Sequence, residues 1–216
     1  MYIFQPERIL LRQEVIKYAH YITGKTLDVG AGDGSRYGGL FPCKEYITMD
    51  VQPGKGVDIV GRAEHIPLPD SEVDSIVCTQ VLEHLNKPFE SVEEFYRILK
   101  PGGYILLTAP QMNELHEEPN DFFRYTKFGL IDMFENVGFT VVAYEQRGGF
   151  FTTRGQMLIR YLVDRLRLYQ RPLLGRILGK VILVYGRSMM WLDTKDTSVA
   201  NRKNTLGWCF VFKKKR

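Results

Sequence analysis

The sequence has little of what would place it among disulfide-rich, metal-binding or membrane-spanning proteins. Its three cysteines, Cys43, Cys78 and Cys209, are odd in number, lie far apart and lack the spacing of metal ligands. We therefore expect reduced thiols and no metal site. A run of about eighteen apolar residues, which a membrane-spanning helix needs, is absent. The first residues also lack the basic start and apolar stretch of a signal peptide. These absences predict a cytoplasmic protein.

Acidic residues are scarce in the last third of the chain. Residues 151–216 hold 15 Lys and Arg against 3 Asp and Glu, a net charge of +12. Residues 1–150 hold 14 against 22, a net charge of −8. Internal repeats and low-complexity segments are also absent, and the length of 216 residues suits one large domain or one domain with an appendage. An acidic body therefore carries a basic section that needs its own explanation.

Short apolar runs alternate with helix-like segments in the acidic body. Ser91 is the expected N-cap of one helix, since Glu94 follows it at the spacing of a capping box. Strands that alternate with helices favour an α/β fold, a parallel sheet with helices on both faces. We predict helices at 6–21, 91–100 and 127–136, and strands at 27–29, 46–49, 57–60, 73–78, 104–108, 139–144 and 206–212.

The first strand ends in three glycines at alternate positions, Gly30, Gly32 and Gly34. Without a Cβ, such a loop lets a ligand lie directly against main chain. A helix opening after the loop would direct its N–H groups and dipole at a polar or anionic ligand group. A tight turn without a ligand is the alternative. Asp28 lies inside the apolar strand, where a carboxylate is costly unless paired, so we expect it to orient the loop or to accept from a ligand ammonium group.

Polar residues follow the ends of the next strands as well. Asp50 ends the second strand, and the loops at Ala63–Glu64 and Thr79–Gln80 follow the third and fourth. In parallel sheets ligands bind beyond the carboxyl ends of the strands, where a carboxylate can accept both hydroxyls of a ribose. Capping of a turn before Pro53 is the alternative role of Asp50. We predict a nucleoside-containing cofactor at this edge, which leaves a nicotinamide-dependent oxidoreductase as one alternative.

Five motifs occur in a fixed order: Asp28-Val-Gly-Ala-Gly-Asp-Gly34, Asp50, Ala63-Glu-His-Ile-Pro-Leu-Pro-Asp70, Val81-Leu-Glu-His-Leu85 and Leu99-Lys-Pro-Gly-Gly103. Together they resemble the class I S-adenosylmethionine-dependent methyltransferases, in particular the type 11 branch that includes quinone-biosynthesis enzymes. The resemblance covers about residues 20–150 and the last strand. It implies a Rossmann-like, seven-stranded, mostly parallel sheet with an antiparallel last strand, and S-adenosyl-L-methionine as the cofactor. The glycine spacing and the last motif argue against the nicotinamide alternative.

By position, the resemblance assigns cofactor contacts to residues that follow four of the strands. The family often has an Asp directly before the alanine of the third loop, and Arg62 stands there. Recognition of adenine would then rest on main chain or on Glu64. The implied contacts are Asp28, Gly30, Ala31 and Gly32 to the methionine part, Asp50 to the ribose hydroxyls, Ala63 and Glu64 beside adenine, and Gln80 and Val81 on its other side.

The chemistry asks little of side chains, because a sulfonium already activates its methyl group and transfer depends mainly on in-line positioning. A base is needed only where the acceptor loses a proton. His116 is our candidate base, since imidazole exchanges protons readily near neutral pH; an exposed loop histidine is the alternative. Glu83 and His84 are expected to hold the loop after the fourth strand. The loop 111–125 should lie over the methyl donor, and its predicted acceptor residues are Glu117, Asp121, Arg124 and Tyr125.

The loop from His116 to Thr126 also looks like a stretch of type 11 members that act in glycan or cell-surface biosynthesis. We therefore predict transfer of a methyl group to an oxygen or carbon of a small-molecule, or lipid- or glycan-linked, acceptor. A non-catalytic module that binds S-adenosyl ligands and acts through protein or membrane partners is the alternative. A basic interaction protein on an enzyme fold is another, and salt-sensitive binding without turnover would reveal it.

The basic section has helical spacing on both sides of Pro172, with apolar residues on one face and Arg and Lys on the other. Such helices suit an anionic membrane surface, which would make the protein peripheral there. Packing of the apolar faces of 152–191 on the domain, or in a homodimer, is the alternative. Nucleic acid is disfavoured, because no groove-reading or stacking motif accompanies the charge. We predict a core at 1–150, a basic helical insert at 151–195, and the last strand with a basic tail at 196–216.

Overall fold

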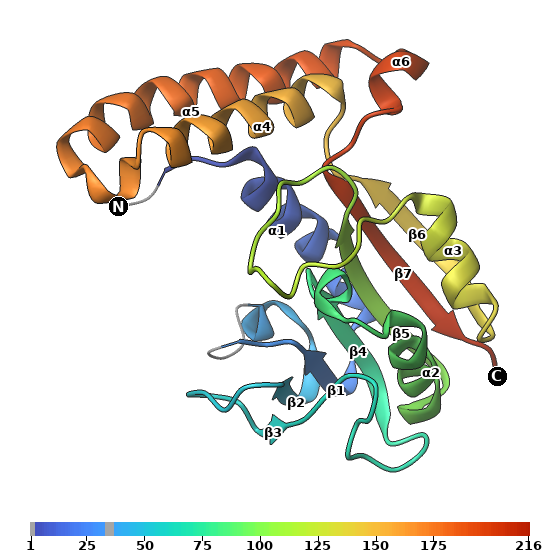
Figure 1. The fold of residues 1–216 in the computed structure, drawn as a ribbon. Coiled ribbons are helices and arrows are strands. Elements are labelled where there is room, and N and C mark those ends of the chain that lie inside the picture. Colours follow the sequence, from blue (N-terminus) through green and yellow to red (C-terminus); the bar gives the residue numbers. More distant parts are fainter. Residues whose placement is uncertain (1–2, 33–36) are drawn as a thin grey trace. The chain divides into compact units, whose positions relative to one another are not determined.

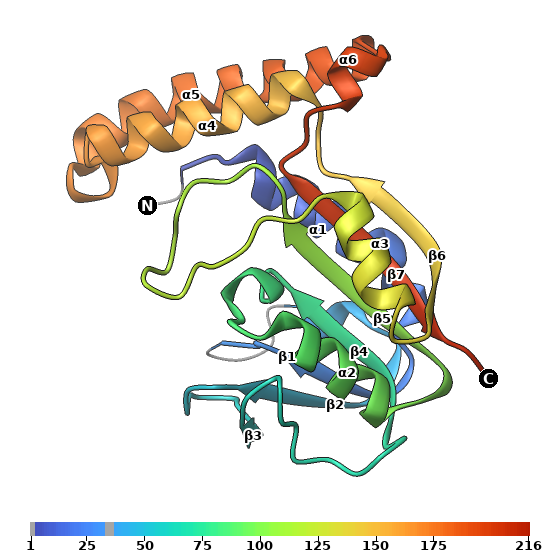
Figure 2. The ribbon, with the colours of Figure 1, turned by 45° about the vertical axis from the view of Figure 1, so that its right-hand side comes forward.

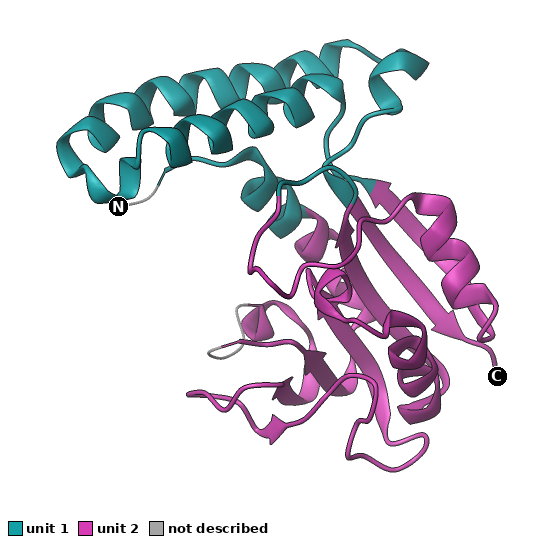
Figure 3. Cartoon of the chain, in the orientation of Figure 1, with its two compact units in different colours: residues 1–13, 111–114, 146–207 teal, residues 14–110, 115–145, 208–216 magenta. Residues whose placement is uncertain are grey.

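A computed structural model describes residues 3–32 and 37–216 of the chain. They fall into two compact units (Figure 3). The helical unit comprises residues 1–13, 111–114 and 146–207, and the sheet unit comprises residues 14–110, 115–145 and 208–216. The helices and strands, with η for 3-10 helices, are α1 (Pro6–Tyr18), η1 (Ala19–Tyr21), β1 (Gly24–Val29), η2 (Gly38–Leu40), β2 (Cys43–Asp50), β3 (Ile59–Val60), β4 (Val73–Thr79), η3 (Leu82–His84), α2 (Pro88–Ile98), β5 (Leu99–Pro110), α3 (Lys127–Glu135), β6 (Phe139–Gln146), α4 (Phe150–Arg165), η4 (Leu168–Gln170), α5 (Pro172–Lys195), α6 (Val199–Arg202) and β7 (Gly207–Lys214).

The seven strands form one sheet in the order β3-β2-β1-β4-β5-β7-β6 (Figure 1). The four pairings from β3 to β5 are parallel, and the last strand, β7, is antiparallel. This confirms the predicted Rossmann-like sheet. The strand order reverses between β1 and β4, where Val29 pairs with Cys78. The carboxyl ends of these two strands therefore meet at the switch point, where ligands of such sheets bind.

Both faces of the sheet are covered. Phe95 of α2 and Phe134 of α3 are fully buried in the cluster that covers one face, and these helices lie side by side on the sheet in Figures 1 and 2. Leu106 points to the opposite face, because side chains alternate along a strand, and it is fully buried as well. On that face Tyr21 of η1 packs against Tyr104 of β5, with ring centroids 5.3 Å apart. Helical segments on both faces were predicted.

The helix predicted after the glycine loop is not found among the described residues between β1 and β2. They contain η2 alone, three residues that include Gly38 and Gly39, and glycine is a poor helix former. Gly34 lies outside the described residues. The third strand is also shorter than predicted, because the carboxylate of Asp58 accepts from the main-chain N of Thr48 at 2.9 Å and turns the chain there.

The helix predicted to begin at Ser91 begins at Pro88 instead, with Pro in its first turn. Proline fits this place because its missing N–H is not needed there. The hydroxyl of Ser91 donates to the carbonyl of Lys87 at 3.1 Å. Glu94, the other half of the expected capping box, accepts from the main-chain N of Ile66 at 2.9 Å. The capping-box pattern therefore gave a wrong helix start, because Glu94 makes a tertiary hydrogen bond with Ile66 instead of capping the helix.

In the helical unit, α4 and α5 lie side by side (Figures 1 and 2). Glycines permit this close approach. A Cβ on Gly155 of α4 would lie 2.7 Å from Cγ of Met189 in α5, and one on Gly186 of α5 would lie 3.2 Å from Cδ1 of Ile159 in α4. Ile159 and Ile182 are buried in the resulting core. Part of the apolar surface predicted for this section thus packs within the unit itself. None of the described helices is long and apolar enough to cross a membrane.

Asp193 of α5 caps the first turn of α4. Its carboxylate oxygens accept from the main-chain N of Gly149 at 2.7 Å, of Phe151 at 3.0 Å and of Thr152 at 3.0 Å. These N–H groups have no partner within the helix, and a carboxylate at this end also favours the helix dipole. Asp193 therefore joins the two long helices of the unit.

We predict that Asp193→Ala lowers the free energy of unfolding by about 1–2 kcal/mol, the usual cost of a lost N-cap. Asp164→Ala is the matched control, because Asp164 lies exposed on α4. Urea unfolding followed by circular dichroism measures both. Equal midpoints for the two variants would show that the cap does not stabilise the unit.

Candidate active site

The glycine loop meets the loop after β4 at the switch point. Gly30 and Gly32 have φ of +73° and +62°, values that favour glycine. The main-chain N atoms of Gly30 and Ala31 donate to the carbonyl of Met49 at 2.8 and 3.1 Å. A Cβ on Gly30 would lie 2.3 Å from Cγ2 of Val81. The structure thus brings together two of the predicted cofactor segments, and glycine is needed at position 30 for its conformation and for this contact.

Asp28 is 4% exposed, and its Oδ2 accepts from the hydroxyl of Tyr46 at 2.8 Å. Burial raises the pKa of this carboxyl to about 6, the hydrogen bond from Tyr46 opposes the shift, and the charge of Asp50 adds to it. A buried acid is held partly protonated until a cation comes near it. The ammonium group of a methionine moiety is such a cation, so the electrostatics of Asp28 fit its predicted role.

Asp50 supports the glycine loop. Its Oδ2 accepts from the main-chain N of Gly32 at 2.9 Å, and its Oδ1 accepts from that of Gln52 at 3.0 Å. The second bond is the turn-closing contact that the sequence offered as an alternative role. The first places the carboxylate next to the predicted binding loop. Its contact with ribose stays a prediction.

The residues predicted beside adenine make contacts of their own. Ala63 is buried. Glu64 forms an ion pair with Arg62, the residue at which the sequence departs from the family. Gln80, with φ of +55°, donates through its main-chain N to the carbonyl of Thr108 at 3.0 Å. Arg62 therefore engages the carboxylate that could have replaced the missing Asp, which leaves main chain as the more available partner of adenine.

The loop predicted to receive the acceptor is fastened to η3. Its residues Phe122 and Phe123 donate through their main-chain N atoms to the carbonyl of Glu83 at 2.9 and 3.2 Å. The hydroxyl of Tyr125 donates to the carbonyl of Leu82 at 2.9 Å. Glu83 was expected to hold the loop after β4, and its main chain holds the loop after β5. Tyr125 is buried, so its hydroxyl serves this attachment.

The polar residues of the acceptor loop are ordered around Asp121, whose side chain is 1% exposed. Arg124 donates to both of its oxygens, at 2.6 and 2.8 Å, and this holds the pKa of Asp121 well below its usual range. Asp121 also accepts from the main-chain N of His116 at 2.9 Å, and Nδ1 of that ring is 3.3 Å away. Glu117 is exposed.

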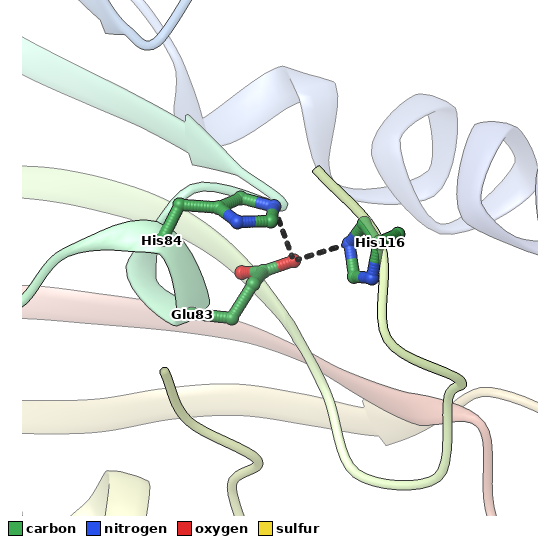
Figure 4. A group of neighbouring side chains, drawn as sticks. All are labelled: Glu83, His84 and His116. Atoms are coloured by element: carbon green, nitrogen blue, oxygen red, sulfur yellow. Dashed lines mark ion pairs between the residues drawn. The ribbon is translucent and has the colours of Figure 1, made fainter. Parts of the chain in front are cut away.

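The structure adds a group that the sequence did not predict. Glu83, His84 and His116 point toward one another (Figure 4). Glu83 and His84 follow β4, and His116 lies in the loop after β5. Because these residues are far apart along the chain, the cluster could not be predicted from the sequence. A glutamate and a histidine next to each other in the loop after β4 were the available signal.

Comparison with known proteins identifies the family. The model of the methyltransferase domain family, type 11, matches residues 27–107. A probable S-adenosylmethionine-dependent methyltransferase of Mycolicibacterium smegmatis is 34% identical over 115 residues, 46% of this chain and 44% of that protein. Residues 27–107 therefore form a domain of the class I S-adenosylmethionine-dependent methyltransferase family. A malonyl-[acyl-carrier protein] O-methyltransferase of Methylococcus capsulatus is 33% identical over 101 residues, 39% of this chain and 37% of that protein.

A solved structure extends the likeness to the whole fold. A putative methyltransferase of Bacillus halodurans has a TM-score of 0.60 and 16% identity, and the match covers 95% of this chain and 99% of that one. The matched part spans less than half the length of the two relatives named above. S-adenosylmethionine is the cofactor of the family. The buried carboxylate of Asp28 fits the ammonium group of this cofactor. The main chain of Gly30 and Gly32, which carries no Cβ, fits a close approach of the cofactor.

We predict that affinity for S-adenosylmethionine rises between about pH 5 and pH 7. The ligand ammonium group binds the ionised form of Asp28, whose pKa is about 6 in the free protein, so below that pH binding must first displace a proton. Calorimetric titration across this range measures the effect. Asp28→Asn should bind more weakly at pH 7 and show a flat profile.

The Asp28→Asn variant also tests how the stability of the free protein depends on pH. The folded-state pKa of Asp28 lies above the ordinary 3.8, so the stability of the free protein falls as pH rises from about 4 to about 6. Asp28→Asn should remove this loss, worth roughly 3 kcal/mol at most. Asp132→Asn, on the exposed side of α3, should behave like the unmodified protein in both experiments, and a pH profile of Asp28→Asn that matches it would contradict the assignment.

Proposed function

We propose that this chain transfers a methyl group from S-adenosylmethionine to an oxygen or carbon of a small-molecule, or lipid- or glycan-linked, acceptor. The observation that carries the proposal is the meeting of the glycine loop with Val81 at the switch point. This contact supports one cradle in which Asp28 faces the ammonium group and Asp50 the ribose of the cofactor. The name of the Methylococcus relative specifies O-methylation, which favours oxygen as the acceptor atom.

The residues of the chain bind the cofactor and the acceptor and orient them for transfer. The bound cofactor supplies a methyl group that its sulfonium already activates. The loop after β5 is well placed to hold the acceptor, because it leaves and returns to the end of that strand, where the main-chain N of Tyr125 donates to the carbonyl of Pro110 at 2.9 Å. The Arg124–Asp121 pair fixes the loop. Such an ordered polar loop favours an enzyme over a module that binds S-adenosyl ligands alone.

Calorimetric titration with S-adenosylmethionine, S-adenosylhomocysteine and NAD tests the cofactor half of the proposal. We expect micromolar binding of the first two and none of NAD. Asp50→Ala should weaken binding at least tenfold, since a hydrogen bond to a charged group contributes about 1.5–3 kcal/mol. Because Asp50 also supports Gly32, loss of affinity alone does not prove contact with ribose.

A ligand without the 2′-hydroxyl separates the two roles of Asp50. The unmodified protein should bind 2′-deoxy-S-adenosylhomocysteine at least tenfold more weakly than S-adenosylhomocysteine. Asp50→Ala should bind both equally, because the partner of the hydroxyl is gone. If the variant discriminates as strongly as the unmodified protein, Asp50 does not contact ribose. Formation of S-adenosylhomocysteine with an offered acceptor tests turnover, and binding without turnover of any acceptor would favour the non-catalytic module.

We further propose that the helical unit binds an anionic membrane surface. One side of α5 packs on α4, with Ile182 buried, and the other exposes an apolar stripe. Basic residues lie along one flank of this stripe at helical spacing and are exposed. Apolar side chains bordered by Lys and Arg suit the boundary between head groups and acyl chains. The stripe is Leu173, Ile177, Val181, Val184 and Trp191, and the flank is Arg176, Lys180 and Arg187.

We predict that replacing Arg176, Lys180 and Arg187 together by Gln lowers partitioning onto phosphatidylglycerol-containing vesicles on the order of 100-fold, at about 1 kcal/mol per basic residue. Ile177→Ser with Val181→Ser should also lower it. Sedimentation with these vesicles, and with neutral phosphatidylcholine vesicles as the control, measures both. Unchanged sedimentation, with a monomer–dimer equilibrium that the Ser variant shifts, would instead assign the stripe to a second copy of the chain.

A further inference from the structure

The cluster of Glu83, His84 and His116 has the composition and spacing of a metal site. One ligand atom from each residue can be chosen such that all three lie within 4.8 Å of one another (Figure 4). Nε2 of His84 is 3.9 Å from Oε1 of Glu83, and Nε2 of His116 is 4.0 Å from the same oxygen. These separations exceed hydrogen-bond length. The three atoms therefore converge on a common point without bonding directly to one another.

The other nitrogen of each ring faces an oxygen. Nδ1 of His84 is 2.5 Å from the carbonyl of Asn120, and Nδ1 of His116 is 3.3 Å from Oδ2 of Asp121. These oxygens only accept, so in a neutral ring Nδ1 carries the proton and Nε2 is the nitrogen that faces the cluster. Metal-binding histidines are oriented in this way, with the second nitrogen donating to a carbonyl or carboxylate.

We propose that Glu83, His84 and His116 bind a divalent first-row transition metal ion, Zn²⁺ being the probe of choice. Two imidazole nitrogens and one carboxylate oxygen are a common ligand set for such ions, and three protein ligands leave a position for water or substrate. In a tetrahedral zinc site with bonds of about 2.0–2.2 Å, the ligand atoms lie roughly 3.4 Å apart. Binding would shorten the present separations of 3.9 and 4.0 Å to this spacing.

Burial of Glu83 supports the assignment. Its side chain is 0% exposed, and buried carboxylates in proteins are paired, hydrogen-bonded or bound to metal ions. Glu117 has Oε2 4.0 Å from Nε2 of His84 and is 75% exposed. It is therefore able to supply a further oxygen ligand. One carboxylate with two neutral imidazoles leaves a bound divalent ion with a net positive charge, which attracts an oxygen of the acceptor.

The position of the cluster gives the ion a role that rests on the proposed function. Glu83 lies two residues beyond Val81, which contacts Gly30 of the cofactor loop. A metal-bound hydroxyl group loses its proton to water more readily than a free one. The resulting oxygen then forms a bond to the methyl carbon, the bond from that carbon to sulfur breaks, and its electron pair returns to sulfur. In this role His116 is a metal ligand and not the base predicted from the sequence.

Metal binding by the full chain tests the site, and the chain provides its own controls. Of its four histidines, His20 and His65 are exposed and outside the cluster. We expect one Zn²⁺ per chain in calorimetric titration, with affinity lowered at least 100-fold in His84→Ala and in His116→Ala. His20→Ala and His65→Ala should bind as the unmodified protein does. Binding of Co²⁺ should give visible absorption bands that the first two variants lose.

Folding of each variant is checked by its thermal unfolding and by its binding of S-adenosylhomocysteine. Glu83→Gln keeps the size and main chain of Glu83 and should also lose the metal. Absence of stoichiometric binding, or an equal loss in the His20 and His65 controls, would overturn the site. These readouts need no turnover, so they stand if the proposed function fails. If the metal binds and its removal leaves the rate of methyl transfer unchanged, the catalytic role is wrong.

Discussion

The contact between Gly30 and Val81 is the constraint on which the rest of the site depends. A Cβ at position 30 would lie 2.3 Å from Cγ2 of Val81, so the loop after β1 approaches the loop after β4 only as bare main chain. The same close approach fixes where η3 begins, because η3 starts at the residue after Val81. Through η3 it also positions the acceptor loop, whose main chain bonds to the carbonyl of Glu83. One glycine thus links the donor side of the site to the acceptor side.

Two buried carboxylates define the electrostatics of this region. Asp28 and Glu83 are 4% and 0% exposed, and burial of an acid favours its protonated form or a cationic partner. Glu83 contributes to raising the pKa of Cys78 and of Tyr125, for which burial is the larger cause. Asp28 therefore lowers the stability of the free protein as its carboxyl ionises and gains from the ammonium group of the cofactor. The proposed metal ion would place positive charge beside Glu83.

The fold could be predicted from the sequence because its signals are local. Apolar runs gave the strands, and glycines marked the loop at the switch point. Predictions failed where a distant residue changed a local pattern, as when Ile66 engages Glu94 and the helix begins at Pro88. The cluster at Glu83 could not be predicted for the same reason, since the path of the acceptor loop brings His116 to it. The contacts of Asp28 and Asp50 with ligands stay predictions.

If His116 is a metal ligand, the polar residues of the acceptor loop have a different role. Arg124 holds Asp121 with two hydrogen bonds, and Asp121 in turn faces Nδ1 of His116. This order of contacts fixes the ring so that Nε2 points at Glu83. Asp121 and Arg124, which the sequence assigned to the acceptor, then act through His116 and need not touch the acceptor at all. A base beside the oxygen would then be unnecessary, because a bound ion would stabilise the deprotonated oxygen and water would carry the proton away.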